Sequence, residues 1–219
     1  MSSELVLYVW GYNYSSWSMR AGLAVRQTGA EFRELDVHQE PEGVAAVKAR
    51  SPNGLFPLLK HGTEWVWDSL AISEYLAELF PDAGLWPGDS AARAHARSMA
   101  AEMHSGFVAL RSALPMNIRA QYPGFVKTPP VRQDIVRICA MWQACLDRYG
   151  GAGPFLFGSF TLADAFFAPV VMRFASYEVE LTPPLAAYAD AVRAQPFVKD
   201  WVSRANLDRR VNPAYEFTR

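Results

Sequence analysis

Apolar positions change their period several times over the first 80 residues, as expected for short strands that alternate with helices. Four apolar runs have the length and composition of strands, at residues 5–9, 32–37, 56–60 and 64–67. Helical spacing marks residues 16–28, 44–49 and 70–80. Gly29 follows the first of these helices, a position where glycine commonly ends a helix. The order β-α-β-α-β-β-α predicts a small α/β domain.

After residue 89 the helical period continues without strands. A long helix is predicted from one apolar face, made of Met99, Met103, Gly106, Leu110 and Leu114. A second face is made of Ile135, Ile138, Trp142, Leu146 and Tyr149. The proline-rich stretch 115–130 is predicted to be loop, a third helix to open at Thr161, and two short helices to be separated at Gln195–Pro196. We therefore expect an α/β domain over 1–81, a linker over 82–89 and an all-helical domain over 90–219.

Composition and charge exclude several classes of protein. The 219 residues are 51% hydrophobic, enough to bury a core and too apolar for a disordered chain. Because 21 Lys and Arg are balanced by 22 Asp and Glu, neither a nucleic-acid nor a membrane partner is expected. Cys139 and Cys145 are six residues apart on a predicted helix and should not pair, and the scattered histidines predict no metal site. Without a signal peptide or a spanning segment, the protein is expected in the cytoplasm.

Ser15 and Ser16 lie between the first strand and the first helix. Such a junction brings a hydroxyl and several free backbone N–H groups to one point, at the positive end of the helix dipole. An anion, including a thiolate, would be stabilised there. The other interpretation is an ordinary serine N-cap.

Pro57 opens the third strand, after Phe56. If the Phe56–Pro57 bond is cis, it turns the backbone N–H and C=O of Phe56 outward toward a ligand. The alternative is a trans proline that opens an edge strand.

Asp68 and Ser69 precede the helix at 70–80. There they could hold the ammonium and the carboxylate of a ligand together, or they could simply cap the helix.

His104, Phe107 and Arg111 share one face of the predicted long helix, with Met116 and Asn117 just after it. A mixed aromatic, imidazole and guanidinium stripe could line a cleft for a small molecule that is apolar and could also be acidic. The alternative is a partly solvated helix face.

Together with the capping box at 161–164, these motifs resemble the cytosolic glutathione S-transferase superfamily, and within it a serine-type bacterial member with a zeta- or theta-like N-terminal motif. The resemblance covers nearly the whole chain and implies a thioredoxin-like domain followed by a helical bundle. It implies that Ser15, with Ser16 as the close alternative, is catalytic. It implies that Phe56 and Pro57 bind the cysteinyl unit of glutathione, and that Asp68 and Ser69 bind its γ-glutamyl end. A homodimer is also implied.

One departure concerns charge. Many relatives have a lysine where this chain has Leu55, so His38 or Lys48 must meet the glycyl carboxylate of glutathione, or affinity for glutathione is reduced.

Two further departures concern the start of the first helix. The cysteine that thiol-transferring relatives have there is absent. No tyrosine ends the first strand as in tyrosine-type classes, and nearby Tyr12 is assigned to the substrate pocket with His104, Phe107 and Arg111.

The expected function is a glutathione transferase without a metal. The serine stabilises the thiolate of glutathione, a co-substrate, for attack on a small electrophile of mostly apolar character. Two alternatives stay open. One is a glutathione-dependent cis-trans isomerase, similar to maleylacetoacetate isomerase, and the other is a non-catalytic interaction module with the same fold.

Overall fold

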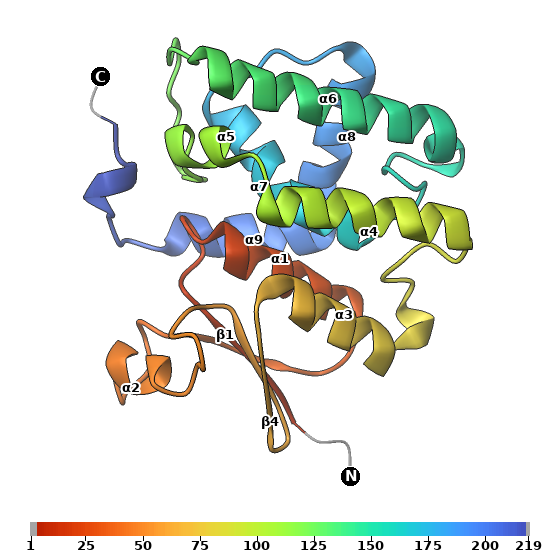
Figure 1. The fold of residues 1–219 in the computed structure, drawn as a ribbon. Helices are drawn as coiled ribbons and strands as arrows, with labels where there is room; N and C mark the ends of the chain where they lie inside the picture. The colour runs from red at the N-terminus through yellow and green to blue at the C-terminus, as the bar shows by residue number, and fades with distance from the viewer. Residues whose placement is uncertain (1–3, 218–219) are drawn as a thin grey trace.

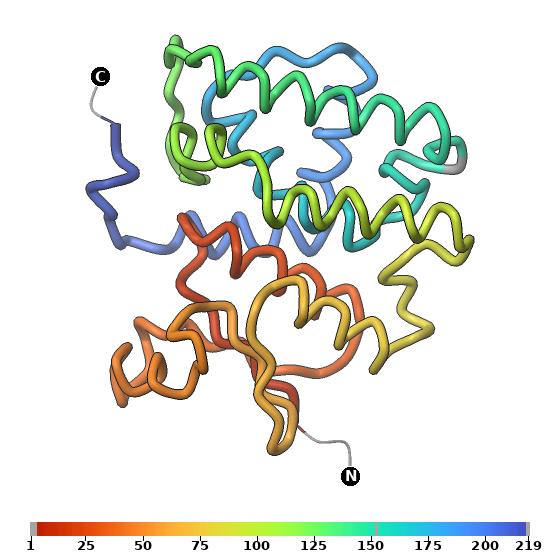
Figure 2. The backbone as a smooth tube through the Cα atoms, in the orientation of Figure 1, coloured from red at the N-terminus to blue at the C-terminus, as the bar shows by residue number. Residues whose placement is uncertain are grey.

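A four-stranded mixed sheet forms the centre of the N-terminal half in the computed structural model, which describes residues 4–217 (Figure 1, Figure 2). Its strands lie in the order β2-β1-β3-β4. Their bounds are Leu5–Val9 for β1, Arg33–Asp36 for β2, Leu58–His61 for β3 and Glu64–Trp67 for β4. β1 runs parallel to β2 and antiparallel to β3, which is antiparallel to β4. The sequence predicts all four strands to within two residues.

Helices cover both faces of this sheet, because successive strand residues point to opposite sides. The helix bounds are Ser16–Gln27 for α1, Val44–Lys48 for α2 and Ser69–Leu79 for α3. On one face Leu5, Leu7 and Val9 pack in a core that α1 and α3 share. On the other face Val6 and Tyr8 pack in a smaller core with α2. The first turn of α1 is thereby held at the junction with the second half (Figure 1).

The second half is built from helices. Their bounds are Ser90–Ser105 for α4, Val108–Ala113 for α5, Pro129–Tyr149 for α6, Leu162–Ser176 for α7, Pro183–Ala194 for α8 and Pro196–Leu207 for α9. Within residues 4–217, no helix combines the length and apolar content needed to cross a membrane. Cys139 and Cys145 are free, as expected. We propose the domain limits expected above, 1–81 and 90–219, of which 1–3 and 218–219 lie outside the described part of the chain.

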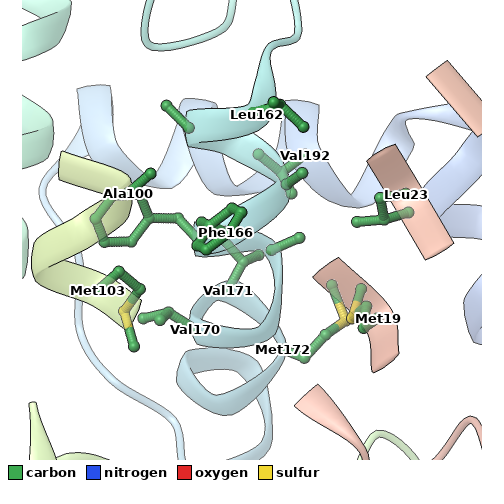
Figure 3. Close-up of a cluster of buried hydrophobic side chains, with 14 of the residues drawn as sticks. Met19, Leu23, Ala100, Met103, Leu162, Phe166, Val170, Val171, Met172 and Val192 are labelled. Atoms are coloured by element: carbon green, nitrogen blue, oxygen red, sulfur yellow. The ribbon is translucent and has the colours of Figure 1, made fainter. Parts of the chain in front are cut away.

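Helix α7 is buried on every side and joins the two halves (Figure 3). Met19 and Leu23 of α1 pack against it from the α/β domain. Met103 of α4 packs against α7 beside Val170 from the helical domain. A helix that is apolar all round needs partners on all its faces, which explains why α7 is enclosed.

The prediction of one long helix over residues 99–114 is wrong. The helix breaks at Gly106, whose backbone is extended, and Phe107, whose φ of 57° is left-handed. A Cβ atom at position 106 would lie 2.7 Å from the carbonyl oxygen of Glu102, so only glycine fits there. The new helix α5 is stabilised from α6, because the carboxylate of Asp134 accepts a hydrogen bond from the N–H of Leu110 at 2.9 Å. His104 and Arg111 therefore lie on different helices.

The capping box at the start of α7 is confirmed. The fully buried carboxylate of Asp164 accepts hydrogen bonds from the backbone N–H and the hydroxyl of Thr161, at 2.8 and 3.1 Å. It also accepts one from the N–H of Leu156 at 3.2 Å. Burial raises the pKa of Asp164 to about 6, so the carboxylate is charged at neutral pH. One side chain thus fixes both the start of α7 and the loop before it.

Replacing Asp164 by Ala is expected to lower the free energy of unfolding by about 3 kcal/mol, because it leaves buried N–H donors at Leu156 and Thr161 unpaired. Urea denaturation at neutral pH measures this loss. The matched control is Asp190→Ala on the exposed surface of α8, for which we expect a change below about 0.5 kcal/mol. Equal stabilities of the two variants would contradict this account of α7.

Candidate active site

Two neighbouring cavities lie at the start of α1. The larger, called here the outer groove, has a volume of about 580 Å³. It is lined by Trp10, Tyr12, Ser15, His38, Lys48, Gly54, Leu55 and Phe56, and by side chains of the segment 208–213. The smaller, the inner pocket, has a volume of about 310 Å³ and is lined by Ser16, Val108, Arg111, Ser112, Pro115, Met116 and Arg173. Both are bordered by Tyr14, Trp17 and Tyr215.

The two candidate serines face different cavities. Ser15 is the N-cap of α1 and lines the outer groove. Its hydroxyl accepts a hydrogen bond from the N–H of Ser18 at 3.2 Å and donates one to the Ser18 hydroxyl at 2.8 Å. Ser16 is buried beside the inner pocket, where its hydroxyl accepts a hydrogen bond from Nη2 of Arg173 at 3.3 Å. Both the capping and the anion-site interpretations of Ser15 are therefore compatible with the geometry.

The Phe56–Pro57 peptide bond is cis, the first of the two possibilities that the sequence leaves open. Phe56 lines the outer groove and stacks on Trp10, with 5.6 Å between ring centres. Pro57 directly precedes β3.

Asp68 and Ser69 lie at the start of α3, on the domain junction. Asp68 adopts a φ of 75°, which is uncommon outside glycine. Its Oδ1 accepts hydrogen bonds from the N–H groups of Leu70 and Ala71, so it caps α3 as the sequence allows. Its Oδ2 lies 3.3 Å from Nε2 of His104. The hydroxyl of Ser69 is buried without a hydrogen-bond partner among the described residues, and it lines neither cavity.

His104 connects the helical domain to this corner of the α/β domain. Burial lowers the pKa of His104, and the charges of Arg20 and Arg111 lower it further, while the charge of Asp68 opposes them. The imidazole is therefore neutral at neutral pH. Its contact with Asp68 is then a hydrogen bond rather than an ion pair, and the carboxylate charge of Asp68 also acts on buried Arg20, whose pKa it raises.

The inner pocket is electropositive. Arg173 is 4% exposed and donates hydrogen bonds to the carbonyl of Leu114 at 2.8 Å and to Ser16. Burial, and then the charge of Arg111, lowers the pKa of Arg173 to about 10, so it remains charged. Arg111 lines the same pocket. No carboxylate is among the described residues that line it, so the pocket suits an anion.

Of the four residues expected in the substrate pocket, only Arg111 lines the inner pocket, and His104 lines neither cavity. Tyr12 borders the outer groove, but its hydroxyl donates a hydrogen bond to Glu34 at 3.1 Å. Burial and the charge of Glu34 raise the pKa of Tyr12 to about 12. Phe107 is 8% exposed, packs in the main core and lines neither cavity.

The segment after α9 forms a wall of both cavities and was not expected from the sequence. Arg210 pairs with the buried carboxylate of Asp36 and with Asp208 at 2.7 Å. The hydroxyl of Tyr14 donates a hydrogen bond to Glu216 at 2.5 Å and accepts one from the N–H of Asn212 at 3.2 Å. These bonds close the outer groove on its C-terminal side.

Comparisons with known proteins now give the family. The sequence model described as "Glutathione S-transferase, N-terminal domain" matches residues 14–79. The model described as "Glutathione S-transferase, C-terminal domain" matches residues 90–202, more than half of the chain. The chain belongs to the glutathione S-transferase family. The thioredoxin-like domain followed by a helical domain, expected from the motifs, is confirmed for this glutathione S-transferase.

Several relatives of this glutathione S-transferase carry names of isomerases. Maleylpyruvate isomerase of Ralstonia sp. is 31% identical over 199 residues, which cover 82% of this chain and 89% of the relative. Probable maleylacetoacetate isomerase of Caenorhabditis elegans is 26% identical, with coverage of 81% and 82%. Among solved structures, a glutathione transferase homolog from Burkholderia with bound glutathione matches with a TM-score of 0.70 and 22% identity, covering 93% and 98% of the two chains.

Replacing Asp68 by Asn removes the neighbouring charge that favours protonated His104, so the pKa of His104 is expected to fall further below 6.5. Arg111→Met removes a nearby cation and is expected to raise it. NMR titration of the His104 ring protons measures both changes, with Asp190→Asn on α8 as the matched control. An unchanged pKa in Asp68→Asn is the outcome that contradicts the contact between Asp68 and His104.

Proposed function

We propose that this glutathione S-transferase isomerises a small conjugated diacid from the cis to the trans form, with glutathione bound in the outer groove. The observation that carries the proposal is the inner pocket, which holds two guanidinium groups and no carboxylate among its described lining residues. Carboxylates are the natural partners of such groups. The isomerase names of the relatives in Ralstonia and C. elegans support the same substrate class.

We propose that glutathione lies in the outer groove and that its γ-glutamyl end extends to the start of α3. There the unpartnered hydroxyl of Ser69 and the carboxylate of Asp68, which line neither cavity, are proposed to bind that end. Phe56 and Pro57 are proposed to bind the cysteinyl unit beside Ser15. The side chain of Lys48 passes over Gly54 into the groove, and we propose that it meets the glycyl carboxylate.

Lys48 is favoured over His38 for this role because of charge. His38 also lines the groove, but burial and the charge of Arg210 lower its pKa. At neutral pH the imidazole is therefore uncharged, whereas an ammonium group carries a full positive charge. This assignment supplies the cation that is missing at Leu55.

When bound, glutathione supplies a thiolate that adds to the conjugated double bond and leaves after rotation about the resulting single bond, so that it is not consumed. We propose that the hydroxyl of Ser15, which lines the outer groove at the start of α1, donates a hydrogen bond to the sulfur. Hydroxyl hydrogens rotate freely, so the hydrogen bond between the two hydroxyl groups can reverse, with Ser18 donating to Ser15. The hydroxyl hydrogen of Ser15 is then available to donate to the sulfur. Lowering a thiol pKa by about 2 units needs about 2.7 kcal/mol. One charge-assisted hydrogen bond and the N-terminus of α1 together are of that order.

Arg111 and Arg173 have the second task. They are proposed to hold the carboxylates of the substrate and to stabilise the negative charge that develops on the conjugated carbonyl oxygen. Ser16, hydrogen-bonded to Arg173, then serves the substrate side rather than the thiol side. His104 contributes to this corner through Asp68, since it does not line the inner pocket.

Conjugation is the second candidate. Val108, Pro115 and Met116 give the inner pocket an apolar side that would accept an electrophile, to which the sulfur then stays bonded. Ser15, Asp68 and Ser69 together weigh against a non-catalytic module.

We further propose that the enzyme acts as a homodimer in the cytoplasm. A nucleic-acid partner is not proposed, consistent with the net charge of -1.

Turnover with a limiting amount of glutathione tests the proposed reaction. With maleylpyruvate or maleylacetoacetate in large excess, we expect many molecules of trans product for each glutathione, because isomerisation regenerates the thiol. Product analysis by chromatography measures this ratio. Conjugation instead stops after one equivalent of glutathione, and that result would replace isomerisation by the second candidate.

Ser15→Ala is expected to raise the apparent pKa of the bound glutathione thiol by one to two units and to lower kcat about tenfold to a hundredfold, because the donor to the sulfur is lost. The pH dependence of kcat and the thiolate absorbance of the complex measure the change. Ser16→Ala is the matched comparison, and we expect it to raise the KM for the diacid without shifting the thiol pKa. If Ser16→Ala shifts the thiol pKa and Ser15→Ala does not, the two serines exchange roles.

A further inference from the structure

Trp17 lies in the first turn of α1 and borders both cavities. The proposed function gives roles to the serines on its N-terminal side and to the arginines of the inner pocket. It leaves the indole ring between them without a role. The surroundings of this ring indicate what it does.

Three side chains surround the ring of Trp17. The guanidinium carbon of Arg20 lies 4.6 Å from a ring centre, and that of Arg111 lies 4.7 Å away. The imidazole of His104 meets the ring edge-on, with 5.1 Å between centres. A guanidinium within about 6 Å of an indole is attracted to its electron-rich face. One ring from the α/β domain therefore attracts cations from both domains.

Arg20 shows how strongly this part of the site depends on aromatic rings. It is 1% exposed, and its Nε and Nη1 atoms have no hydrogen-bond partner among the described residues. Burial, and then the charges of Arg173 and Arg111, lowers the pKa of Arg20 to about 9, so it stays charged at neutral pH. Besides Trp17, the ring of Phe166 lies 5.1 Å from its guanidinium carbon.

Arg111 has a second support that comes from the break between α4 and α5. Because α4 ends at Ser105, the carbonyl groups of His104 and Gly106 accept hydrogen bonds from Nη1 of Arg111, at 3.3 and 3.1 Å. No carboxylate pairs with Arg111 within residues 4–217, and burial lowers the pKa of its guanidinium. Two carbonyl groups and the indole ring thus fix this cation at the inner pocket.

We propose that Trp17 is a positioning residue for substrate specificity: its indole ring holds the Arg111 guanidinium in the orientation that receives a substrate carboxylate. This inference rests on the proposed function, because it assigns an acidic substrate to the inner pocket. A guanidinium that is already fixed loses less side-chain entropy on binding than a mobile one does. Trp17 therefore increases affinity for acids through Arg111 rather than through a contact of its own.

Calorimetric titration of the full chain with succinate, an unreactive diacid, tests the proposal. Trp17→Leu removes the aromatic face but keeps an apolar side chain, and Trp17→Phe keeps an aromatic ring. We expect Trp17→Leu to weaken succinate binding about tenfold, equivalent to about 1.4 kcal/mol, and Trp17→Phe to weaken it less than threefold. Arg111→Met is the positive control and is expected to lose at least as much as Trp17→Leu.

A double-mutant cycle separates positioning from simple packing. If Trp17 acts through Arg111, the variant that combines Trp17→Leu with Arg111→Met binds succinate no more weakly than Arg111→Met alone. Additive losses, or an unchanged affinity in Trp17→Leu, overturn the proposal. Circular dichroism confirms that each variant is folded, and Trp17→Met replaces Trp17→Leu if the latter does not fold.

Titration of the wild-type protein with reduced glutathione keeps the two proposals apart. A protein that binds glutathione but not succinate overturns the role of Trp17 and leaves the glutathione site intact. Binding of succinate without glutathione overturns the proposed function. In that case a tenfold loss of succinate affinity in Trp17→Leu still supports the positioning role.

Discussion

The packing of α1 against α7 is the contact on which the rest of the active site depends. Met19 and Leu23 bury one face of α1 on α7, and this contact fixes the first turn of α1 at the domain junction. Ser15 then faces one cavity and Ser16 the other, because consecutive residues at a helix start point in different directions. Near the far end of α7, Arg173 reaches Ser16. The same buried interface therefore holds the domains together and places both sides of the reaction.

That placement has an electrostatic cost. Arg20 and Arg173 are both buried, and burial together with repulsion from neighbouring arginines, Arg111 in both cases, lowers their pKa values. Buried charges without opposite charges destabilise a fold unless hydrogen bonds or aromatic rings compensate them. Here a backbone carbonyl compensates Arg173, and the ring of Trp17 compensates Arg20. A substrate carboxylate completes the compensation, so a binding site is the place where such a cost is tolerated.

The sequence predicts the fold well because local periods decide most of it, as in β1 and α6. It does not predict the break at Gly106, since the apolar spacing of Met103 and Leu110 is the same on one helix or on two. Arg173 is not among the residues expected at the site, although the sequence contains a signal for it. A helix that is apolar on all sides indicates burial, and arginine is almost never fully buried without a partner. The segment 208–216 has no period to recognise, and long-range bonds alone place it.

The division of the site between the domains explains how the fold can keep one co-substrate and change the other. Groups proposed for glutathione come mostly from the α/β domain, where β1, β3 and the ends of α1 and α3 are fixed by a shared core. Groups proposed for the substrate come mostly from the helical domain, with Arg111 on α5 and Arg173 on α7, while Ser16 of α1 supports Arg173. In this chain the substrate side presents two guanidinium groups without a carboxylate partner at the inner pocket. Since an unpaired buried cation is stabilised most by an incoming anion, an acid gains more from this pocket than a neutral molecule of the same shape does.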